Sequence, residues 1–522
     1  MRKNATISTV KSWRNKRKRV TLAMEFTWNQ KLYDEIISCT EPLAKRPEQK
    51  NYDITAARYD DLVTVEEEEY FTHPLGPYQG MKQELKKDKA YTSQKLIRHT
   101  RQVPFSGRAI QQAIDDAAEA GGGTVVIPEG IFYTGALELK SNVELHLAYG
   151  AQLCFMRNKT NHYYPVRFSR WEGVECMNFS PFIYANGAEN IAVTGTGTLD
   201  GCADEFNWMP WKFGYFGETD QEEQRQRLFR MSAGNKEPET RVFDDTVSTL
   251  RPPFLQFYRC KNVLVQDVEI ANSPFWEINP VLCENVLIKG VHVETNLYNN
   301  DGVDPESSKN LLIEDCYFQT GDDCIAIKSG RNDDGRRIGV PCENLVIRNN
   351  TFSNGHGGIT IGSEISGGVK NVFAEHNSFD SPNLDYPVRF KTNAQRGGRL
   401  ENIYVRDSVV NKSRLAVVHC DFFYEEGEHG PYMPLLRNVT VDGFQTQPGG
   451  SIDAEHAFYL RGFKQAPIEN VTFRNMELNG VRGEAVLENI QHLRFENVTI
   501  NGIRQKDETV DIGEQAAAEE AV

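Results

Sequence analysis

The chain has 522 residues, of which 39% are hydrophobic and 25% charged, with 41 glycines and 22 prolines. This composition is typical of a soluble globular protein and excludes collagen-like, mucin-like and disordered classes. The net charge of −15 argues against bulk nucleic-acid binding, because such binding needs a positive field. An anionic ligand would therefore have to bind at a local group of cations.

The cysteines and the N-terminal segment bear on cellular location. The ten cysteines are widely spaced and include no CxxC pair, so we interpret them as reduced residues of the core. A basic N-terminal arm is followed by VTLAMEFTW, in which Glu25 interrupts the apolar run that a secretory signal needs. No stretch approaches the ~18 apolar residues of a membrane span. We therefore expect a cytoplasmic protein without membrane contact, or a secreted one if the true start of the chain differs.

The two ends of the chain differ from the region between them. Residues 1–100 combine a basic arm, the acidic run Glu66–Glu69 and a lysine-rich stretch without sustained periodicity, and we interpret them as an extension of uncertain structure. Residues 505–522 are acidic and rich in small side chains, which indicates a mobile tail. A single long domain is expected over residues 101–504.

The central domain begins with a helical pattern. Apolar positions at helical spacing over residues 108–120 predict a helix that stops at the three glycines 121–123. Residues 124–155 then alternate in polarity as strands do. The simplest interpretation is a helix that caps the first strands.

A repeat follows after residue 185. Each unit opens with an asparagine and a short alternating strand, at residues 190, 262, 285, 310, 344, 371, 402, 438 and 470. Such spacing suits a solenoid whose coils bury their apolar faces against one another. A leucine-rich repeat would need fixed leucines and a helix in each unit, so we predict an all-β fold, a right-handed single-stranded parallel β-helix. The asparagines either stack as a side-chain ladder or merely reflect turn preference.

Four polar clusters fall in consecutive repeats. If each coil contributes one cluster, they stack on one face of the solenoid and bring carboxylates, a histidine, an arginine and a lysine together. The clusters are Asn299–Asp304, Thr320–Cys324, Asn354–Gly358 and Val388–Lys391.

The paired carboxylates favour glycoside hydrolysis. That reaction needs one carboxylic acid to protonate the leaving oxygen and another carboxylate to activate water or attack carbon. Asp322 and Asp323 would push each other's pKa values apart, but a bend or bulge at Gly321 is needed to turn both outward. An Asp-Asp pair alone is more often a solvated turn. Asp301 one coil earlier and His356 one coil later favour a site instead.

The remaining polar residues have plain and functional interpretations. His356 is either an exposed turn histidine or a partner that shares a proton with Asp322 or holds the substrate. Arg389 and Lys391 are either an ordinary polar face or a pair of cations for an acidic sugar, with Phe390 between them facing the core. We also expect a local cationic cleft with salt-sensitive substrate affinity, formed by Lys328, Arg331, Arg336, Arg337, Arg389 and Lys391.

Taken in order, these motifs resemble the four signatures of the polygalacturonases, glycoside hydrolase family 28, over about residues 108–504. The motifs are Asn299-x-Asp301, Gly321-Asp322-Asp323, Gly355-His356-Gly357 and Arg389-Phe390-Lys391. GDDCIAIKSGR and SPFWEINPVLCENV are similar to bacterial, often exo-acting, members. The chain departs from the family pattern at Phe390, where an aliphatic residue is usual, and at RHTRQVPFSGRAIQQ, where an FGA-x-GDG-like strand and turn usually stand.

The resemblance implies a fold, an activity and residue roles. The fold would be a pectin-lyase-like solenoid, and the activity an inverting hydrolysis of α-1,4-galacturonosidic bonds in polygalacturonate or its oligomers, without a metal or cofactor. Asp322 would be the general acid, Asp301 and Asp323 would activate water, and His356 would support the acid. The expected substrate contacts are Arg389, Lys391, Asn299, Lys328 and Tyr424.

Several alternatives stay open. The aromatic segment from Cys202 to Leu250 would either wall one end of the cleft and enforce attack at a chain end, or form a surface insertion. Rhamnogalacturonan or xylogalacturonan could be the substrate. A calcium-dependent pectate lyase would use the aspartates as metal ligands, and a β-helical carbohydrate-binding protein would have no catalysis. The expected partner is an acidic oligo- or polysaccharide, and the oligomeric state cannot be read from the sequence.

Overall fold

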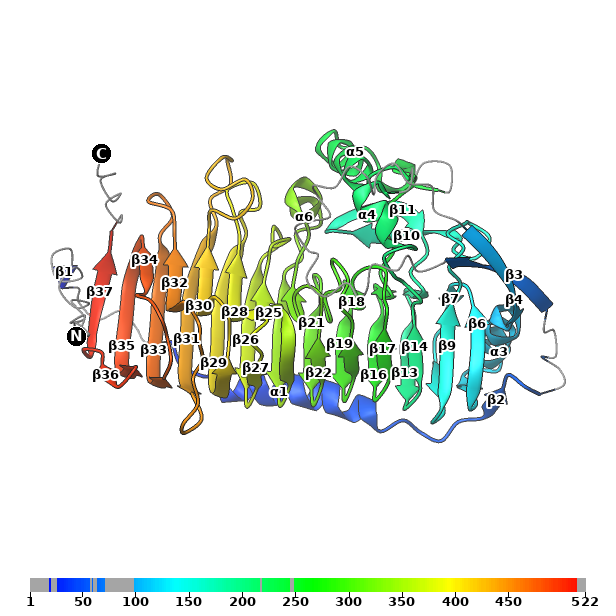
Figure 1. Cartoon of the computed structure of the whole chain (residues 1–522), viewed down its shortest axis with the longest axis horizontal. Coiled ribbons are helices and arrows are strands. Elements are labelled where there is room, and N and C mark those ends of the chain that lie inside the picture. Colours follow the sequence, from blue (N-terminus) through cyan, green and yellow to red (C-terminus); the bar gives the residue numbers. More distant parts are fainter. Residues whose placement is uncertain are drawn as a thin grey trace, which may run out of the picture.

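The computed structural model describes residues 18–19, 26–56, 59, 63–70, 98–215, 218–244 and 248–513. Its body is a right-handed parallel β-helix, a long stack of coils that runs from one end of the molecule to the other (Figure 1). Strands of successive coils pair in parallel and form three sheet faces. The predicted fold class is therefore confirmed.

The first face carries the strands that open the repeats. Short β2 (Asn51–Asp53) pairs with its first strand. In order of pairing, the strands are β5 (Gly123–Ile127), β8 (Val143–Leu147), β13 (Glu189–Gly195), β16 (Lys261–Gln266), β19 (Glu284–Lys289), β21 (Lys309–Glu314), β24 (Cys342–Arg348), β26 (Val369–Glu375), β29 (Arg399–Lys412), β31 (Leu435–Gln445), β33 (Ile468–Leu478) and β35 (Ile490–Ile500).

The second face follows the first around each coil. Its strands are β6 (Gly130–Thr134), β9 (Ala151–Phe155), β14 (Thr198–Asp200), β17 (Glu269–Ala271), β20 (His292–Glu294), β22 (Tyr317–Gln319), β25 (Thr351–Ile361) and β27 (Ser378–Asp380). Beyond β27, the long strands β29 and β31 bend around the corner and continue this face.

The third face carries the candidate site. Strand β25 continues onto this face after its bend, and isolated bridges at Val303 join β18 to β23. The other strands are β7 (Leu137–Glu138), β12 (Ile183–Asn186), β15 (Leu255–Tyr258), β18 (Ile278–Val281), β23 (Ile325–Ile327), β28 (Leu384–Lys391), β30 (Ala416–Asp421), β32 (His456–Arg461) and β34 (Val486–Glu488).

The core is a column of apolar side chains stacked in register. Each residue of the column lies beside its counterpart in the next coil, so the same position is apolar in every repeat. The aligned, buried residues of the first face are Val125, Leu145, Val193, Val265, Ile288, Ile313, Ile347, Ala374, Val405, Val441, Phe473 and Phe495.

An asparagine ladder runs along one corner of the solenoid. Of the two interpretations of the repeated asparagines, the side-chain ladder is therefore confirmed. Each amide donates Nδ2–H to the Oδ1 of the preceding asparagine at 2.8–3.2 Å. Each residue has a φ between 54° and 65°, a left-handed conformation that asparagine tolerates better than most residues. The ladder residues are Asn142, Asn190, Asn262, Asn285, Asn310, Asn344, Asn371, Asn402, Asn438 and Asn470.

Both ends of the solenoid are covered. Helix α3 (Gly107–Glu119) buries Ile110 and Ile114 against the first coil, so the predicted capping helix is confirmed. At the other end, β36 (Ile503–Arg504) and β37 (Glu508–Ile512) pair antiparallel with β35. The prediction of a mobile tail is therefore wrong for residues 508–512, because Val510 is buried and β37 pairs with an edge strand that would otherwise be open. Residues 514–522 lie outside the described residues.

The described part of the N-terminal extension packs on the solenoid. Helix α1 (Gln30–Thr40) lies along the outside of the first face, as Figure 1 shows, and is followed by η2 (Glu41–Ala44). Tyr33 and Ile36 are buried there against outward-facing Leu287 and Leu312. The basic arm before residue 18 and the lysine-rich stretch lie outside the described residues, and β1 (Lys18–Arg19) pairs with β37.

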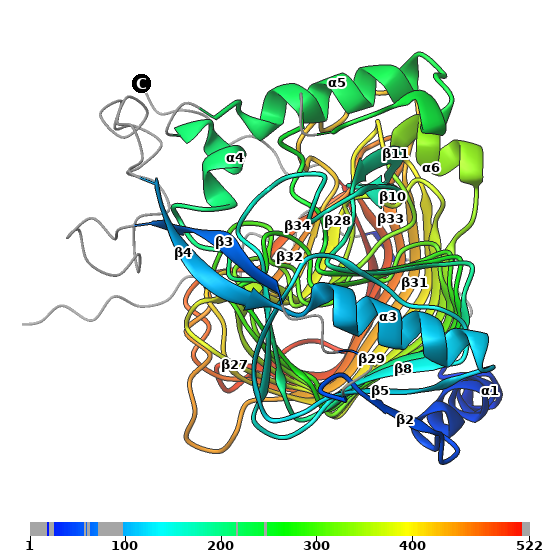
Figure 2. The same ribbon diagram turned by 90° about the vertical axis from the view of Figure 1, so that its right-hand side faces the viewer.

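Two antiparallel elements stand outside the three faces. Strands β3 (Val63–Tyr70) and β4 (Arg98–Phe105) form an antiparallel ribbon before α3, and β10 (Val166–Trp171) and β11 (Val174–Phe179) form a hairpin. The ribbon joins the second face where β4 pairs with β6. Helices α4 (Met209–Phe213), α5 (Gln221–Ala233), η6 (Pro238–Thr240) and α6 (Asn332–Ile338) lie on the hairpin's side of the molecule (Figure 2). In the part of the chain described, all ten cysteines are free and no helix is long and apolar enough to cross a membrane.

Candidate active site

The four polar clusters lie in four successive coils at the edge of the third face. The bridge from Val303 to Ile325 and the pairing of Ile325 with Ile359 and of Ile359 with Val388 align these coils. Each cluster lies just before the aligned strand or bridge residue of its coil, or within that strand. The structure thus brings together residues that are up to 90 positions apart in the sequence, from Asp301 to Lys391.

Three carboxylates meet at the centre of this group. Asp301, Asp322 and Asp323 have oxygen atoms that all lie within 4.8 Å of one another. Asp322 and Asp323 occupy a bend between β22 and β23, as predicted. A Cβ atom at Gly321 would lie 1.9 Å from the carbonyl oxygen of Leu297. Only glycine fits there, so this bend turns both carboxylates into the site.

Asp322 is the carboxylate that is paired with the histidine. Its Oδ1 lies 2.9 Å from Nδ1 of His356, and its Oδ2 accepts a 3.5 Å contact from Nδ2 of Asn299. Burial is the largest single effect and raises the pKa of Asp322, but the charge and hydrogen bond of His356, together with the charges of Lys391 and Arg389, lower the pKa overall. Asp322 raises the pKa of His356 in return. In the ligand-free protein, the proton that the pair shares therefore rests on the imidazole.

Asp323 lies deeper and is held by two cations. Its carboxylate is fully buried and contacts Nζ of Lys391 at 2.5 Å and Nη1 of Arg389 at 3.3 Å. Thr360 donates its hydroxyl to the same carboxylate at 3.1 Å. Burial raises the pKa of Asp323, yet the charges of Lys391 and Arg389 lower it overall. Asp323 is thus an ionised carboxylate.

Asp301 is the carboxylate with the raised pKa. Burial, followed by the charge of Asp304, raises the pKa of Asp301 well above its ordinary value. Its Oδ1 accepts no hydrogen bond from the residues that the structure describes. The nearest cation, Nζ of Lys328, lies 3.7 Å from its Oδ2.

The prediction that Lys328 contacts a sugar is not supported. Its side chain is only 3% exposed, and its ammonium lies 3.3 Å from Asp304 and 3.1 Å from Glu364. The three carboxylates around it raise its pKa well above the ordinary value against the effect of burial. Lys328 therefore balances buried negative charge beneath the site.

The expected cationic cleft is smaller than predicted. Arg336 and Arg337 pair with Asp333 and Asp334, because this segment forms α6 and places the charges one turn apart. Arg331 is buried against Glu364 at 3.2 Å.

Arg389 and Lys391 remain at the site. They lie 5.9 and 5.6 Å from the ring centre of Tyr424, which places this tyrosine beside both cations. Phe390 is buried in the core, as predicted.

Arg251 belongs to the site but is absent from the predicted motifs. Its guanidinium is fully buried, and Nη2 donates a 2.8 Å hydrogen bond to Oδ1 of Asn299. Nη1 donates to the carbonyl oxygen of Tyr298 at 2.9 Å. These bonds fix the Asn299 amide with its Nδ2 toward Asp322. Arg251 lies 48 residues before Asn299 in the sequence, so only the packing of an insertion brings the two together.

The third face is covered on the N-terminal side of the carboxylates. The β10–β11 hairpin lies over β15 and β18, where Gln256 donates to the carbonyl of Arg170 at 2.8 Å and Gly173 accepts a 3.0 Å bond from the amide of Arg331. Trp171 stacks on Phe275 at 5.3 Å between ring centres. Figure 1 shows the hairpin, α4 and α5 above these coils.

The aromatic segment contributes less to this cover than predicted. Trp208 and Trp211 are buried in the core, and only part of the segment, including α4 and α5, stands beside the site. On the C-terminal side, Tyr386, Tyr459 and Arg461 of the third face remain half-exposed. The site is therefore closed along the solenoid in one direction and open in the other.

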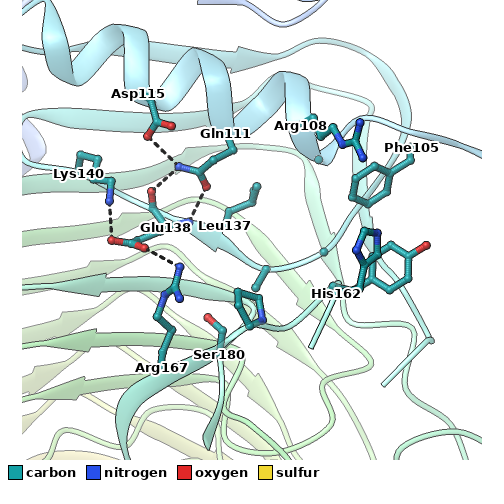
Figure 3. Close-up of a pocket in the computed structure, with 15 residues that line it drawn as sticks. Phe105, Arg108, Gln111, Asp115, Leu137, Glu138, Lys140, His162, Arg167 and Ser180 are labelled. Carbon is teal, nitrogen blue, oxygen red and sulfur yellow. Dashed lines mark hydrogen bonds and ion pairs between the residues drawn. The ribbon is translucent and has the colours of Figure 1, made fainter. Parts of the chain in front are cut away.

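A pocket beside α3, shown in Figure 3, is a second candidate. Its cations Lys140 and Arg167 both contact Glu138, at 2.5 and 3.3 Å. Gln111 bonds to Asp115 at 3.1 Å. These groups satisfy one another, so the carboxylate cluster is the stronger candidate.

The carboxylate cluster is poorly suited to a divalent cation. Its three aspartates could in principle supply oxygen ligands. Lys328, Lys391, Arg389 and a protonated His356 already surround them, and a further positive charge would be repelled.

The chain is similar to proteins of one family. Residues 239–504 match the sequence profile described as "Glycosyl hydrolases family 28". The solved structure of a hyperthermoactive exopolygalacturonase from Thermotoga maritima is 34% identical; the match covers 93% of this chain and 99% of that chain, with a TM-score of 0.78. The "Exo-poly-alpha-D-galacturonosidase" of Dickeya chrysanthemi is 28% identical over 72% of this chain and 64% of its own length. The "Probable polygalacturonase" of Vitis vinifera is 26% identical over 71% of this chain and 70% of its own length.

Proposed function

Because the chain belongs to the glycosyl hydrolases of family 28, we propose that it hydrolyses α-1,4-galacturonosidic bonds in polygalacturonate or oligogalacturonides. One observation carries the proposal: the Asp322 carboxylate is paired with His356 and lies within 4.8 Å of two other carboxylates. Two cations, Arg389 and Lys391, stand beside this group and suit the carboxylates of an acidic sugar.

Asp322 acts as the general acid in this proposal. The imidazole of His356 holds the shared proton before substrate binds, at 2.9 Å from the carboxylate. An anionic sugar beside Asp322 raises the pKa of this carboxyl group, so the proton moves from Nδ1 of His356 to Oδ1 of Asp322 and then to the glycosidic oxygen. Asp322 is 19% exposed, so a ligand can reach it.

Asp301 and Asp323 activate the attacking water. The raised pKa of Asp301 makes its carboxylate, in the ionised form, a stronger base toward water than an ordinary aspartate. Asp323, held ionised by Lys391 and Arg389, keeps a negative charge beside the developing oxocarbenium ion.

Inversion at the anomeric carbon follows from the depth of these two carboxylates. A retaining enzyme needs a carboxylate that attacks carbon directly. Asp323 is fully buried with both oxygens bonded, and Asp301 is nearly buried, so both reach the sugar only through water. The carboxylate oxygens of Asp301, Asp322 and Asp323 lie closer together than the ~6.5–9.5 Å that usually separates the two carboxyl groups of inverting enzymes. Inversion is therefore inferred from the burial of Asp301 and Asp323 and not from this separation. We expect the β-anomer as the first product in proton NMR spectra recorded before mutarotation; the α-anomer would contradict the water-mediated assignment.

Attack at a chain end is supported by the covered side of the third face. The β10–β11 hairpin lies over the third face on the N-terminal side of the carboxylates and is held there by the bonds from Gln256 to Arg170 and from Arg331 to Gly173. This cover favours entry of a polymer from the C-terminal side, where Tyr386, Tyr459 and Arg461 are half-exposed. The Thermotoga maritima protein, matched over 99% of its length, is named an exopolygalacturonase.

The test is product analysis on trigalacturonate and polygalacturonate in the presence of EDTA. We expect saturated galacturonate or a short oligomer from chain ends, with little loss of polymer viscosity. Asp322→Asn is expected to lower kcat by about 10²–10⁴-fold. Asp315→Asn, at an exposed aspartate of the same coil that pairs with Lys289, is the matched control and should retain activity.

Other products would change the assignment. A mixture of oligomers with rapid viscosity loss would contradict chain-end attack but not hydrolysis. An unsaturated product that requires calcium would identify a lyase. Inactivity on both substrates, with activity on a rhamnose- or xylose-containing pectin, would move the substrate to that polymer.

A further inference from the structure

Helix α4 places Lys212 beside the catalytic coil. The Met209 sulfur lies 3.6 Å from Nη1 of Arg251, and the ring centres of Phe213 and Tyr298 lie 4.8 Å apart. Residues three and four positions apart share one helix face, so Lys212 lies on the same face as Met209. That face covers Tyr298, the neighbour of Asn299, whose amide points at Asp322.

Lys212 is a half-exposed cation without a partner. It forms no hydrogen bond or ion pair with any residue in the described ranges, whereas Lys328 and Lys391 contact carboxylates at 3.1 and 2.5 Å. Burial, and then the charge of Arg251, lowers the pKa of Lys212 to about 8, while Glu172 and Asp322 raise it. Its ammonium is therefore charged at neutral pH.

Arg251 makes this part of the site still more positive. Its hydrogen-bond acceptors among the described residues are all neutral: the side chains of Gln221, Asn299 and Met209 and the carbonyls of Pro274 and Tyr298. A buried cation without a carboxylate partner is costly. Arg251 is such a buried cation and Lys212 is a partly buried one beside it, so an anion bound between them would stabilise both.

The two pairs of cations stand on opposite sides of Asp322. Arg389 and Lys391 come from β28, two coils toward the C-terminus, whereas Lys212 and Arg251 lie over the coil of Asn299, one coil toward the N-terminus. In a galacturonan chain that crosses Asp322, consecutive sugars place one carboxylate on each side of the scissile bond. In a polysaccharide in which acidic and neutral sugars alternate, only one of the two sugars that flank the scissile bond carries a carboxylate.

We propose that Lys212 binds the carboxylate of the sugar on the N-terminal side of the scissile bond, and so makes the site specific for two consecutive uronic acids. The proposal rests on the proposed function, because it assigns a substrate contact within that reaction. Arg389 and Lys391 bind the carboxylate of the sugar on the other side. Lys212 is thus a specificity-determining residue supplied by the insertion.

The test compares Lys212→Met with Lys212→Arg. We expect the methionine variant to raise KM for trigalacturonate about 10-fold or more, with a smaller change in kcat, and the arginine variant to recover most of the loss. Lys236→Met, at an exposed lysine of the same insertion, is the matched control. Melting temperatures of all three variants should match that of the parent protein.

Selective esters locate the contact. Two trigalacturonates, methyl-esterified at one terminal sugar or at the other, each lack one carboxylate. Binding is measured by calorimetry with the inactive Asp322→Asn variant. One ester should bind to this variant about 10-fold more weakly than free trigalacturonate does. In the double variant Asp322→Asn, Lys212→Met, the ester and free trigalacturonate should bind equally. The other ester should show no such coupling to Lys212.

The outcomes separate the two proposals. Unchanged KM in Lys212→Met, or equal losses for the free acid and both esters, would overturn the assignment of Lys212 while the hydrolase assignment stands. If the parent protein does not cleave galacturonan, and the Asp322→Asn variant does not bind it, the proposed function itself fails.

Discussion

The imidazole of His356 and the carboxylate of Asp322 form a hydrogen-bonded pair, 2.9 Å apart, that crosses from one coil to the next. Each group shifts the pKa of the other, upward for His356 and downward for Asp322. The pair therefore keeps one proton at pH values at which an isolated carboxyl group would have lost it.

His356→Gln is expected to shift the pH dependence of kcat/KM. Without the imidazolium, the proton for the leaving oxygen must be held by Asp322 alone. A carboxyl group releases that proton at lower pH than the raised histidine does, so the alkaline limb of the profile moves toward acid. At neutral pH we expect kcat/KM to fall about 10²-fold. A uniformly lower profile with the same limbs would contradict proton sharing.

The same pair predicts a window of stability. The lowered pKa of Asp322 contributes stability above its unfolded value of about 3.9, which is lost as pH falls through the folded pKa. The raised pKa of His356 contributes stability below about 6.5, which is lost as pH rises through the folded pKa. Thermal scans of the parent and His356→Gln should differ most between about pH 4 and 6.5; a constant difference would show that the pair is not coupled.

Arg251 is expected to act through Asn299. Arg251→Met frees the Asn299 amide, which can then turn its oxygen toward Asp322, so we expect kcat to fall about 10-fold. Asn299→Ala removes the amide, and in that background Arg251→Met should cost little more. The measurement is a double-mutant cycle on kcat/KM, together with melting temperatures. Additive losses in the cycle would show that Arg251 does not act through Asn299.

The repeated coil explains why most of the site was predictable. One polar cluster per repeat becomes one cluster per coil, so Asp301, Asp322, His356 and Arg389 come together once the solenoid is assumed. Glycine at position 321 marks the bend that turns the Asp pair. Lys212 and Arg251 were not predictable, because they reach the site through an insertion with no repeat pattern.

The outer cover of the first face left a weaker signal. Leu264, Leu287 and Leu312 face outward under α1, and each stands between two inward apolar residues. Three consecutive apolar residues indicate a strand covered on both faces. Alternation of apolar and polar residues predicts strands with one covered face, and runs of three apolar residues do not alternate. Alternation therefore does not mark the outward-facing leucines as a surface that a helix covers, and residues 30–40 were not recognised as that helix.

The asparagine ladder is expected to stabilise the solenoid. Asn310 accepts a 3.2 Å bond from Asn344 and donates a 3.1 Å bond to Asn285, at a φ of 56°. Asn310→Ala loses both bonds and keeps a Cβ in the left-handed region without the polar side chain that makes this conformation tolerable for asparagine; such a conformation costs about 1–2 kcal/mol in strain. Asn310→Gly loses the bonds without that strain. We expect the melting temperatures to rank parent, glycine variant, alanine variant, with activity unchanged, whereas equal values would show that the ladder adds no stability.

Lys328 is predicted to be a stability residue. Its ammonium lies within 3.7 Å of Asp301, Asp304 and Glu364, all of them buried. Lys328→Met leaves these charges without their common partner, a change that typically costs about 3–5 kcal/mol. Lys309→Met, which removes an exposed pair with Glu343, should cost no more than about 1 kcal/mol. Melting temperatures of both variants give the comparison.

The pH dependence of the Lys328 variant distinguishes charge balance from a substrate contact. The pKa values of Asp301 and Asp304 are already raised, so these groups favour the folded state when protonated and oppose it as pH rises through their folded pKa values. Removal of the ammonium raises both pKa values further. The stability deficit of Lys328→Met should therefore shrink as pH falls from neutral. A variant with the parent's melting temperature and a raised KM would instead mean that Lys328 binds the sugar, as its sequence motif predicts.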